Sequence, residues 1–428
     1  MNLPAASDRR RIWLRVGTLL EGIRTTPLRN AHIVYDDQQI LFAGEDLPPR
    51  HLVNENQSAP DVDLPDHTLL PGLIDAHTHL FLEGGELDPQ KRSAYLQQSP
   101  ALLLKQARAR LEKLVRFGIA GVRDAGDKDG VGLALSRLCV DPARPLMPWI
   151  DSPGAALHHR GRYGSFMGHP VEDCGAPREC VEARIHAGAW RIKLIATGII
   201  DFKKGAVTTQ PQMSADEIGA FVAAAASFGK QTFAHASGDA GIQNAIDGDV
   251  DSVEHGFFVR PDQLQRMRDG QIAWVPTFAP VQKQIDHADR LGWDTQTIAN
   301  LHRILDEHAA ALLRAHAIGV LLLAGSDSGS YGVAHGIGLL DEMEAMERAG
   351  LAPLAVLNAA TGVPSNRLEF REKFGRIHHG FFPRFLLTRH SPLETVAHLR
   401  QPKTIIFDGR VIASEESTTA EPFDSSGL

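Results

Sequence analysis

The chain is 428 residues long, has a formal net charge of −8 at pH 7, and contains 43% hydrophobic and 22% charged residues. This composition is typical of a globular protein with one large core and room for a smaller second domain. The acidic balance excludes nucleic acid as the main partner, because binding a phosphate backbone needs a basic face. No apolar run reaches the length that spans a bilayer, so we expect no membrane partner.

The cysteines and the N-terminal stretch bear on the compartment. The three cysteines, Cys139, Cys174 and Cys180, are an odd number and lack metal-finger spacing, which favours a reducing compartment. Residues 1–16, MNLPAASDRRRIWLRV, are basic but lack the apolar core of a signal peptide. We therefore expect a cytoplasmic protein. The oligomeric state stays open, a homo-oligomer included.

Both ends of the chain are predicted to contribute short strands to one small domain. Short β-rich stretches separated by turn residues occur near each end, at residues 11–22, 30–46, 382–389 and 404–414. We predict a small β-sandwich domain built from residues 1–65 and 381–428, ending in a polar, frayed tail from residue 415.

Residues 66–380 alternate predicted strands with amphipathic helices, the pattern of parallel βα units. The candidate strands are residues 69–80, 118–126, 148–154, 191–198, 231–238, 252–258, 272–278 and 320–329. Helices are expected between most of them, for example at 101–117 and at 214–228, where Ser214 and Glu217 have capping-box spacing. Eight such units predict an α/β fold, a (β/α)8 TIM barrel. A doubly wound open sheet is the alternative, but no Gly-rich nucleotide loop follows any strand.

Several predicted strands end in chemically active side chains, where a TIM barrel has its active site. In GLIDAHTHL, His77 and His79 are two residues apart and therefore share one face of a strand end. Later strand ends add Lys193, His235, His255 and Asp327. Four imidazoles and a carboxylate suit zinc, manganese or another borderline divalent ion. Taken singly, each has a plainer interpretation, such as a core histidine, His255 bonded to Glu254, or a turn-capping aspartate.

Lys193 lies between Ile192 and Leu194 in a strand that we expect to be buried. A lone ammonium there would be costly, and more so beside metal ions, which favours the neutral amine. A neutral amine reacts with carbon dioxide to give a carbamate, whose two oxygens suit a bridge between two metal ions. The alternative is a lysine whose ammonium reaches solvent from the strand end.

Together these residues resemble the amidohydrolase superfamily in its binuclear, carboxylated-lysine form. The stretches PGLIDAHTHL, KLIATG, AHASGDAGIQNAIDGDVDSVEHG and GSDSG are similar to the prolidase-like (Xaa-Pro and Xaa-Arg dipeptidase) and imidazolonepropionase-related branch. By that resemblance, N6-carboxylated Lys193 bridges two divalent metal ions, which we expect to be zinc. The other ligands implied are His77, His79 and Asp327 for one ion, and His235 and His255 for the second.

The resemblance implies hydrolysis of an amide bond in a dipeptide or an N-acyl amino acid. Two metal ions would lower the pKa of a bridging water, and Asp327 would take its proton and pass it to the departing amine. A deaminase or cyclic-amide hydrolase stays open, although Lys193 counts against a deaminase. An esterase, lactonase or phosphotriesterase is also compatible with this centre. The complete ligand set disfavours a barrel that acts only as a scaffold.

The loop after the third strand departs from the related dipeptidases. Where they have a GGHG-like stretch, with a histidine thought to meet the substrate carboxylate, this chain has HHRGRYG, and Tyr163 stands in place of that histidine. We expect a small-molecule substrate that bears a carboxylate beside its amide bond. The residues predicted to bind it are His158, His159, Arg160, Arg162, Tyr163 and, after the eighth strand, His335. For the five of these residues that lie between positions 158 and 163, an exposed basic loop is an equal alternative. For His335 the alternative is a capping or packing role at the start of the next helix.

Two further stretches differ from the same relatives. IIDFKKG, residues 199–205, replaces a Gly-rich continuation after the fourth strand. PRFLL, residues 383–387, replaces an Ala-Asp-Leu-Val run, a change that we expect to concern the β domain only. The loop changes leave the substrate open and do not touch the predicted metal ligands.

Overall fold

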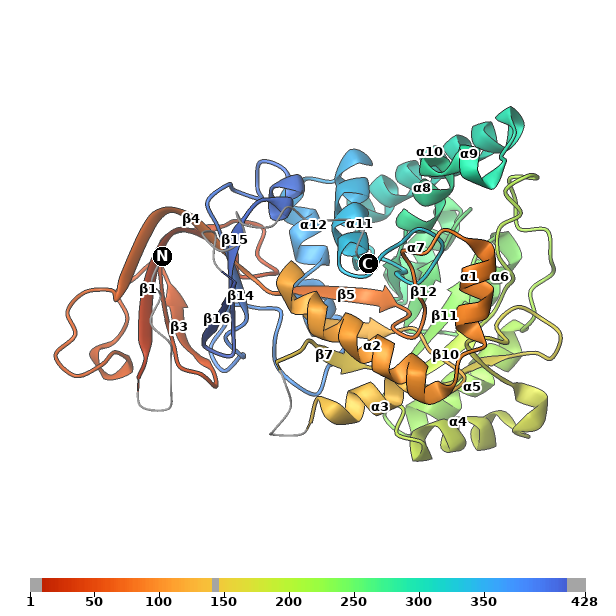
Figure 1. The fold of residues 1–428 in the computed structure, drawn as a ribbon, viewed down its shortest axis with the longest axis horizontal. Helices are drawn as coiled ribbons and strands as arrows, with labels where there is room; N and C mark the ends of the chain where they lie inside the picture. Colours follow the sequence, from red (N-terminus) through yellow and green to blue (C-terminus); the bar gives the residue numbers. More distant parts are fainter. Residues whose placement is uncertain (1–9, 141–145, 414–428) are drawn as a thin grey trace.

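The computed structural model describes residues 10–140 and 146–413, and the tail predicted to be frayed lies outside them. Figure 1 shows two parts, a β-sheet domain and an α/β barrel, joined where β4 (Val62–Pro71) leads into β5 (Leu73–Thr78). The barrel carries the predicted metal ligands, and the sheet domain takes strands from both ends of the described chain.

The sheet domain contains one mixed sheet of seven strands within the described residues, in the order β16-β15-β14-β4-β1-β2-β3. N-terminal β4 therefore lies between N-terminal β1 (Ile12–Leu19) and C-terminal β14 (Phe385–Thr388). The other strands are β2 (Leu28–Tyr35), β3 (Ile40–Gly44), β15 (Lys403–Phe407) and β16 (Arg410–Ala413). Side chains from both ends pack into one core, among them Ile12, Leu14, Ile33, Phe385, Leu387 and Ile406. This confirms the small β domain built from both ends.

The barrel strands occur near the predicted positions and pair in parallel. They are β5, β6 (Ile119–Asp124), β7 (Trp149–Asp151), β10 (Ile192–Ile195), β11 (Thr232–Ala236), β12 (Ser252–His255) and β13 (Ala273–Val275). β5-β6-β7 form one ladder, and β10-β11-β12-β13 form a second, which short β8 (Ala156–His158) and β9 (Gly168–Pro170) extend. Most of their side chains are buried, as expected for a parallel sheet covered by helices.

The eighth predicted strand, residues 320–329, is irregular but joins the two ladders on one side. Its backbone bonds to β13 and β5 are Trp274 N–Leu321 O, 2.8 Å, and Ala76 N–Ala324 O, 2.9 Å. On the other side, β7 and β10 share no ladder. Among the described residues, the gap is spanned by the backbone bond Trp190 N–Ser152 O, 3.1 Å, and by an ion pair between Arg191 and Asp151. The barrel is therefore not hydrogen-bonded all the way round, because β8 occupies the edge of β10 that β7 would otherwise pair with.

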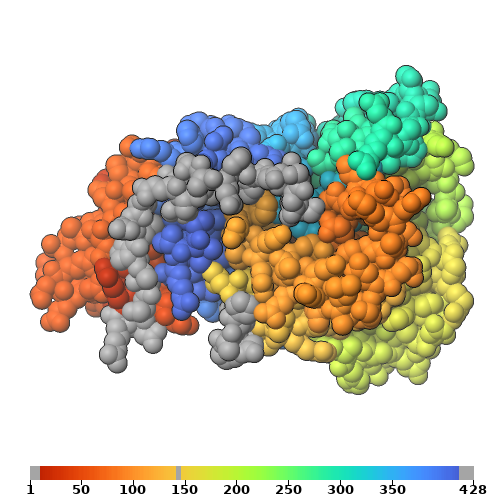
Figure 2. All heavy atoms as spheres, viewed as in Figure 1, coloured from red at the N-terminus to blue at the C-terminus, as the bar shows by residue number. Residues whose placement is uncertain are grey.

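Helices follow the strands around the barrel, as the alternating pattern predicts. They are α2 (Pro100–Leu114), α3 (Val131–Leu138), α4 (Pro177–His186), α5 (Ala215–Ser227), α6 (Asp239–Asp247), α7 (Pro261–Asp269), α8 (Ala279–Asp286), α9 (Ala288–Leu291), α10 (Thr295–Ile318), α11 (Ile337–Arg348), α12 (Pro353–Ala359) and α13 (Gly362–Arg367), with α1 (Pro89–Leu96) inserted between β5 and α2. Short 3-10 turns are η1 (Arg50–Leu52), η2 (Val115–Phe117), η3 (Val171–Asp173) and η4 (Val396–Arg400). Figure 2 shows α1 and α2, in orange, over one face of the barrel. Of the helices described, none has the length and apolar character needed to cross a membrane.

The N-terminus of α5 shows how the local sequence starts a helix. Ser214 Oγ accepts a hydrogen bond from the Glu217 backbone N at 3.2 Å, which confirms the predicted cap. The reciprocal half of the capping box is not used, because the Glu217 carboxylate pairs with His159 at 2.8 Å. A tertiary ion pair has replaced the local contact.

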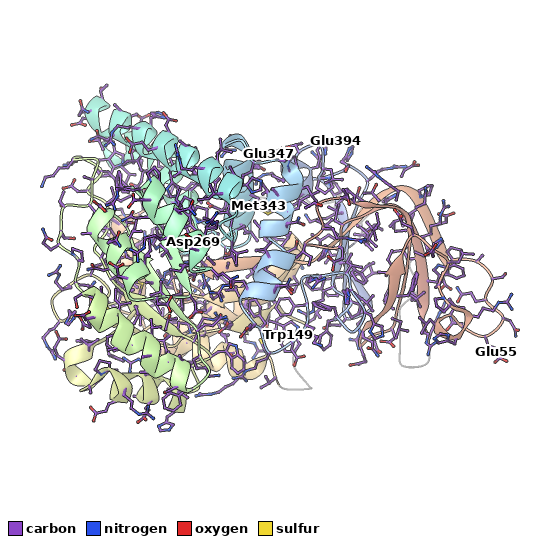
Figure 3. The ribbon with its side chains drawn as sticks, turned by 180° about the vertical axis from the view of Figure 1, so that it is seen from behind. Glu55, Trp149, Asp269, Met343, Glu347 and Glu394 are labelled. Carbon is purple, nitrogen blue, oxygen red and sulfur yellow. The ribbon has the colours of Figure 1, made fainter. Side chains whose placement is uncertain are left out.

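Arg384, just before β14, ties the sheet domain to the barrel. Its buried guanidinium donates to the carbonyl oxygens of Ala120 and Met147, both at 3.1 Å, and binds the Asp408 carboxylate through two nitrogens at 2.7 and 2.8 Å. It also lies 5.4 Å from the ring centre of Trp149, labelled in Figure 3. The altered PRFLL stretch therefore concerns this junction as well as the sheet, contrary to the expectation from sequence.

Candidate metal centre and active site

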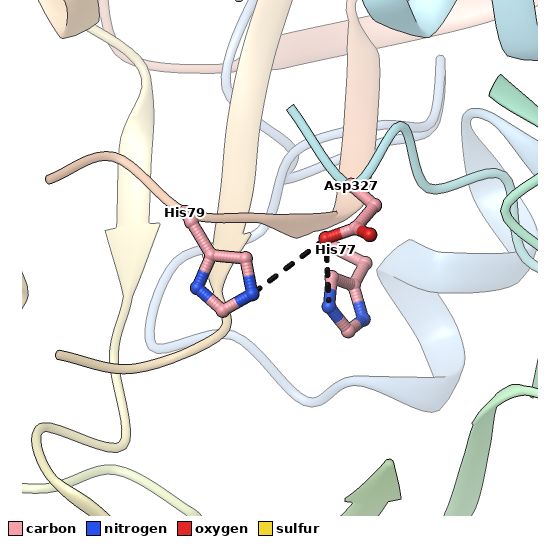
Figure 4. A group of neighbouring side chains, drawn as sticks. All are labelled: His77, His79 and Asp327. Atoms are coloured by element: carbon pink, nitrogen blue, oxygen red, sulfur yellow. Dashed lines mark ion pairs between the residues drawn. The ribbon is translucent and has the colours of Figure 1, made fainter. Parts of the chain in front are cut away.

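Three of the predicted ligands converge at one end of the barrel strands (Figure 4). His77 lies near the end of β5, His79 follows it, and Asp327 belongs to the irregular eighth strand. Their candidate ligand atoms lie within 4.8 Å of one another. Asp327 Oδ1 is 3.5 Å from His77 Nε2 and 3.6 Å from His79 Nε2. Two imidazole nitrogens and a carboxylate oxygen thus face one point.

Hydrogen bonds on the far side of both rings direct their Nε2 atoms to this point. His77 Nδ1 contacts Glu254 Oε2 at 2.5 Å, and His79 Nδ1 contacts Gly126 O at 3.3 Å. The Glu254 and Gly126 oxygens can only accept hydrogen bonds. Each ring therefore carries its proton on Nδ1 and its free lone pair on Nε2. Burial lowers the pKa of both rings, that of His79 to about 3. His77 Nε2 is buried and has no hydrogen-bond partner in the described structure, which fits a metal ligand.

A buried arginine fixes the carboxylate that orients His77. Arg123 Nη2 donates to both Glu254 oxygens at 2.8 Å, and Ser252 Oγ donates to Oε1 at 2.6 Å. A carboxylate behind a ligating imidazole holds the ring and raises its basicity. Glu254 was expected from the sequence beside His255, but it contacts His77.

The remaining predicted ligands lie beside the first group. The His255 ring centre is 5.0 Å from that of His77 and 4.5 Å from that of His235. His255 Nδ1 meets Thr277 Oγ1 at 2.8 Å. The structure therefore brings the four predicted histidine ligands together.

Lys193 is buried among these histidines. Its side chain is 2% exposed, and among the described residues its Nζ has no hydrogen-bond partner. Nζ lies 4.6 Å from the Phe233 ring centre, and burial lowers the pKa of the amine to about 8. This placement excludes the alternative in which the ammonium reaches solvent.

Three residues at the active ends of the strands have left-handed backbones without being glycine. The φ angles are 51° at Asp327, 68° at His255 and 52° at Thr277. Such conformations are strained for residues with a Cβ and persist only where surrounding contacts hold them. Asp327 and His255 are predicted metal ligands, and the Thr277 hydroxyl contacts the His255 ring.

Asp327 has the environment of a proton acceptor. Burial raises the pKa of its carboxyl to about 7, against a hydrogen bond from Ser330 Oγ to Oδ2 at 2.9 Å. Its Oδ1 faces the two histidines, and its Oδ2 is held by the hydroxyl.

A cavity of about 330 Å³ opens onto these side chains. Its walls are mostly apolar and include Leu82, Leu96, Phe166, Ile199, Phe202 and Val281. Polar groups that the sequence did not single out also line it: Arg92, Ser237, Gln284, Ser330 and Tyr331. They lie on α1, on α8 and on loops, and apart from Ser237, which belongs to the quoted AHASGDAG stretch, no motif marks them. A small, largely apolar substrate with a few polar groups fits such a cavity.

The predicted substrate-binding residues are placed differently from one another. Tyr163 lines the cavity, with its ring centre 5.2 Å from that of His235. His335 Nε2 contacts the backbone oxygen of His79 at 3.0 Å and supports the HxH segment from behind. His158 Nδ1 contacts the backbone oxygen of His159 at 2.9 Å.

The basic members of that loop have partners of their own. His159 lies between Glu172 and Glu217, at 2.8 Å from each. Arg160 donates a hydrogen bond to the Asp173 carboxylate, and Arg162 donates one to the Gln210 backbone carbonyl. Neither arginine is among the residues that line the cavity, and their role in substrate binding stays a prediction.

The family model described as Amidohydrolase family matches residues 68–412. The chain therefore belongs to the amidohydrolase family, and it is a hydrolase that acts on amide bonds. Ochratoxinase of Aspergillus niger is 25% identical over 430 residues, covering 94% of this chain and 86% of that protein. The sequence-based assignment to this superfamily is confirmed.

Solved structures of other proteins have a similar fold over most of this chain. A Xaa-Pro dipeptidase with bound methionine in its active site superposes with a TM-score of 0.79 at 22% identity, covering 94% of this chain and 100% of that one. The Aspergillus niger ochratoxinase crystal structure gives a TM-score of 0.76 at 24% identity, covering 95% and 96%. These likenesses support the predicted barrel with its small β domain.

Proposed function

We propose that this protein hydrolyses the amide bond of a dipeptide or an N-acyl amino acid with the help of two divalent metal ions, which we take to be zinc. The observation that carries the proposal is the convergence of His77, His79 and Asp327 in the lining of a largely apolar cavity. The similar dipeptidase with methionine in its active site supports a substrate that contains an amino acid.

The donor set fits the two ions. In the proposal His77, His79 and Asp327 hold one ion, and His235 and His255 hold the other. The Lys193 amine would add to carbon dioxide with formation of an N–C bond and loss of one proton, and the resulting anionic carbamate would be a ligand for the ions. The buried, unpartnered Nζ supports this step, because the carbamate would replace an isolated amine by an anion between cations. When bound, the ions lower the pKa of a water and polarise the substrate carbonyl.

The chain's own residues move the proton. Asp327 accepts it from the attacking water and then delivers it to the nitrogen of the scissile amide, because an amine leaves readily only when protonated. The Ser330 hydroxyl holds the acceptor carboxylate in place. Apolar walls such as Leu82 and Val281 restrict bulk water around the reacting groups.

The proposal also includes the substrate's size and the compartment. The cavity volume suits a small molecule, and we expect a carboxylate next to the scissile amide. A cytoplasmic location stays part of the proposal, supported by the odd number of cysteines in the sequence.

A product-resolved substrate screen tests the proposal. Enzyme loaded with zinc and treated with bicarbonate is incubated with dipeptides, N-acyl amino acids, ring amides, lactones, esters and phosphotriesters. We expect amino acids to be released from the first two classes. Release of ammonia alone would favour a deaminase, and turnover restricted to esters or lactones would replace peptidase-like activity by esterase activity.

A further inference from the structure

We propose that Arg92 and Tyr331 form a subsite that binds the carboxylate of the substrate next to the scissile amide. The subsite rests on the proposed function and adds a specificity-determining pair to it. Arg92 lies on α1 and Tyr331 follows the eighth strand, and both side chains line the cavity. The Arg92 guanidinium carbon lies 5.8 Å from the Tyr331 ring centre.

Arg92 brings a positive charge to the cavity, and among the described residues it forms no ion pair of its own, although the Glu83 and Glu86 carboxylates lie near enough to favour its charged form. Among the ion pairs of the described residues, the nearby carboxylates belong to other cations: Glu83 pairs with Arg110 at 3.2 Å, and Glu86 pairs with Lys91 at 3.6 Å. Burial lowers the pKa of Arg92, but an arginine still keeps its proton at physiological pH. A partly buried guanidinium beside apolar walls attracts an anionic ligand more strongly than it would in open water.

Backbone carbonyls fix the guanidinium and leave part of it free. Arg92 Nη1 donates to Glu83 O at 2.5 Å and to Glu86 O at 3.3 Å, and Nη2 donates to Gly329 O at 3.0 Å. A guanidinium has five N–H donors, so these three bonds leave one on Nη2 and one on Nε. Two such donors match the two oxygens of a carboxylate. The bond to Gly329 holds the group beside the loop that carries Asp327.

Tyr331 supplies a second donor. Its hydroxyl oxygen is buried and has no hydrogen-bond partner among the residues that the structure describes. A buried hydroxyl without a partner is costly, and a ligand oxygen would remove that cost. Arg92 and Tyr331 both donate, so the ligand group that fits them is an acceptor with negative charge.

The position of the subsite indicates which part of the substrate it binds. It adjoins the loop of Asp327, the residue that delivers a proton to the leaving nitrogen. A carboxylate on the carbon attached to that nitrogen is the α-carboxylate of the released amino acid. Leu96 lies one helical turn from Arg92, and Leu82 lines the same cavity. The class of substrate is therefore an N-acyl or N-aminoacyl derivative of an apolar amino acid with a free carboxylate.

Paired probes that differ only in the carboxylate test the subsite. N-acetyl-L-methionine and L-alanyl-L-methionine are compared with their C-terminal carboxamides in kcat/KM for the internal amide bond. Binding of L-methionine and L-methioninamide to zinc-loaded protein is measured by calorimetry, which needs no turnover. We expect wild type to favour the carboxylate form roughly 10- to 100-fold in both measurements, the size of a charge-assisted pair.

The variants separate recognition from loop support. Arg92→Met should abolish the preference, Arg92→Lys should keep part of it, and Tyr331→Phe should reduce it several-fold. Arg110→Met combined with Glu83→Gln is the matched control. Arg110 also binds backbone carbonyls of the loop between β5 and α1, those of Leu80 and Phe81, but does not line the cavity, and Glu83→Gln removes the carboxylate that Arg110→Met alone would leave unpaired near Arg92. The double variant should keep the wild-type preference. Zinc content and thermal midpoint are recorded for every variant.

Each outcome has one meaning. A wild type without preference, or an Arg92→Met variant that keeps the full preference, overturns the subsite while amide hydrolysis stands. A wild type that binds L-methionine through Arg92 but cleaves none of the amide probes keeps the subsite and contradicts the proposed function. Loss of preference in the Arg110→Met/Glu83→Gln control as well would assign the effect to loop disorder and overturn the subsite.

Discussion

The two oxygens of Asp327 have different surroundings. Oδ1 faces His77 and His79, whereas Oδ2 accepts a hydrogen bond from Ser330. Asp327→Asn keeps an oxygen beside the histidines but cannot accept a proton, so we expect kcat to fall by about 10²- to 10⁴-fold. The KM should change much less, because the lost interaction belongs to the transition state. Steady-state kinetics with metal analysis of the same sample check this.

Ser330→Ala is the control for Asp327→Asn. It removes only the hydroxyl that orients Oδ2 and leaves the carboxylate able to accept a proton. We expect a loss of only a few-fold in kcat. If Asp327→Asn keeps its metal ions and turns over within a few-fold of wild type, Asp327 is not the base.

Lys193→Ala tests the bridging carbamate. The variant should lose metal and activity, and a short carboxylic acid in the buffer should restore part of both by occupying the place of the bridge. Lys403→Ala is the control, because Lys403 is also a buried lysine but donates to Leu399 O at 2.6 Å, away from the cavity. It should keep its metal and show no response to the acid. Wild-type metal content in Lys193→Ala would contradict the carbamate.

At the scale of elements, the strand ends were predictable and the loops were not. The alternation of side chains in β5 places His77 and His79 on one face, and the common end of parallel strands predicts their meeting with Lys193 and His255. The eighth segment was predicted as a regular strand, but it is irregular in the structure, and the backbone of Asp327 is left-handed. This segment makes backbone hydrogen bonds to β13 and β5 on either side of it, and its own sequence did not indicate the irregularity.

The subsite and the partners of the loop arginines depend on tertiary contacts. Arg92 belongs to a short helix inserted after β5, and nothing in its local sequence indicates that it faces the cavity. Arg160 and Arg162 looked suited to bind an anion, yet Asp173 and a backbone carbonyl already occupy them. Residue type predicts the chemistry of a side chain, but only the packing of loops decides which partner it meets.

Glu342 links α11 to α8 and gives the fold a pH dependence. Its buried carboxylate accepts from the Ala279 backbone N at 2.9 Å, and burial raises its pKa from 4.5 to about 8. The folded state therefore keeps this proton up to about pH 8, whereas the unfolded chain loses it near pH 4.5. Unfolding releases a proton between these values, so this group's contribution to stability falls as pH rises through that window.

Glu342→Gln removes this titration and keeps the acceptor for Ala279. The variant and wild type should have similar thermal midpoints near the lower end of the window, with the variant becoming the more stable as pH rises toward 8. Thermal unfolding of both proteins across that range, followed by circular dichroism, measures the difference. A difference that is constant with pH would contradict the raised pKa of Glu342.

At the scale of the whole molecule, the metal centre joins parts of the barrel that are far apart in the sequence. His77 comes from the first barrel strand and Asp327 from the last, so an ion bound between them holds the closing side of the barrel, where the ladder is irregular. An ion that binds the folded chain and not the unfolded chain stabilises it by mass action. Activity and stability should therefore change together when metal is removed.

We expect a chelator to abolish amide hydrolysis and to lower the thermal midpoint, and zinc, manganese or cobalt to restore both. Protein prepared with bicarbonate should hold close to two ions per chain if the Lys193 bridge forms. His79→Ala is the control, because it removes one ligand of the first ion and should bind less metal with a smaller shift in midpoint. Elemental analysis, activity and thermal unfolding are measured on the same samples. Full activity with one bound ion would contradict the binuclear centre, and full activity with none would contradict a metal role altogether.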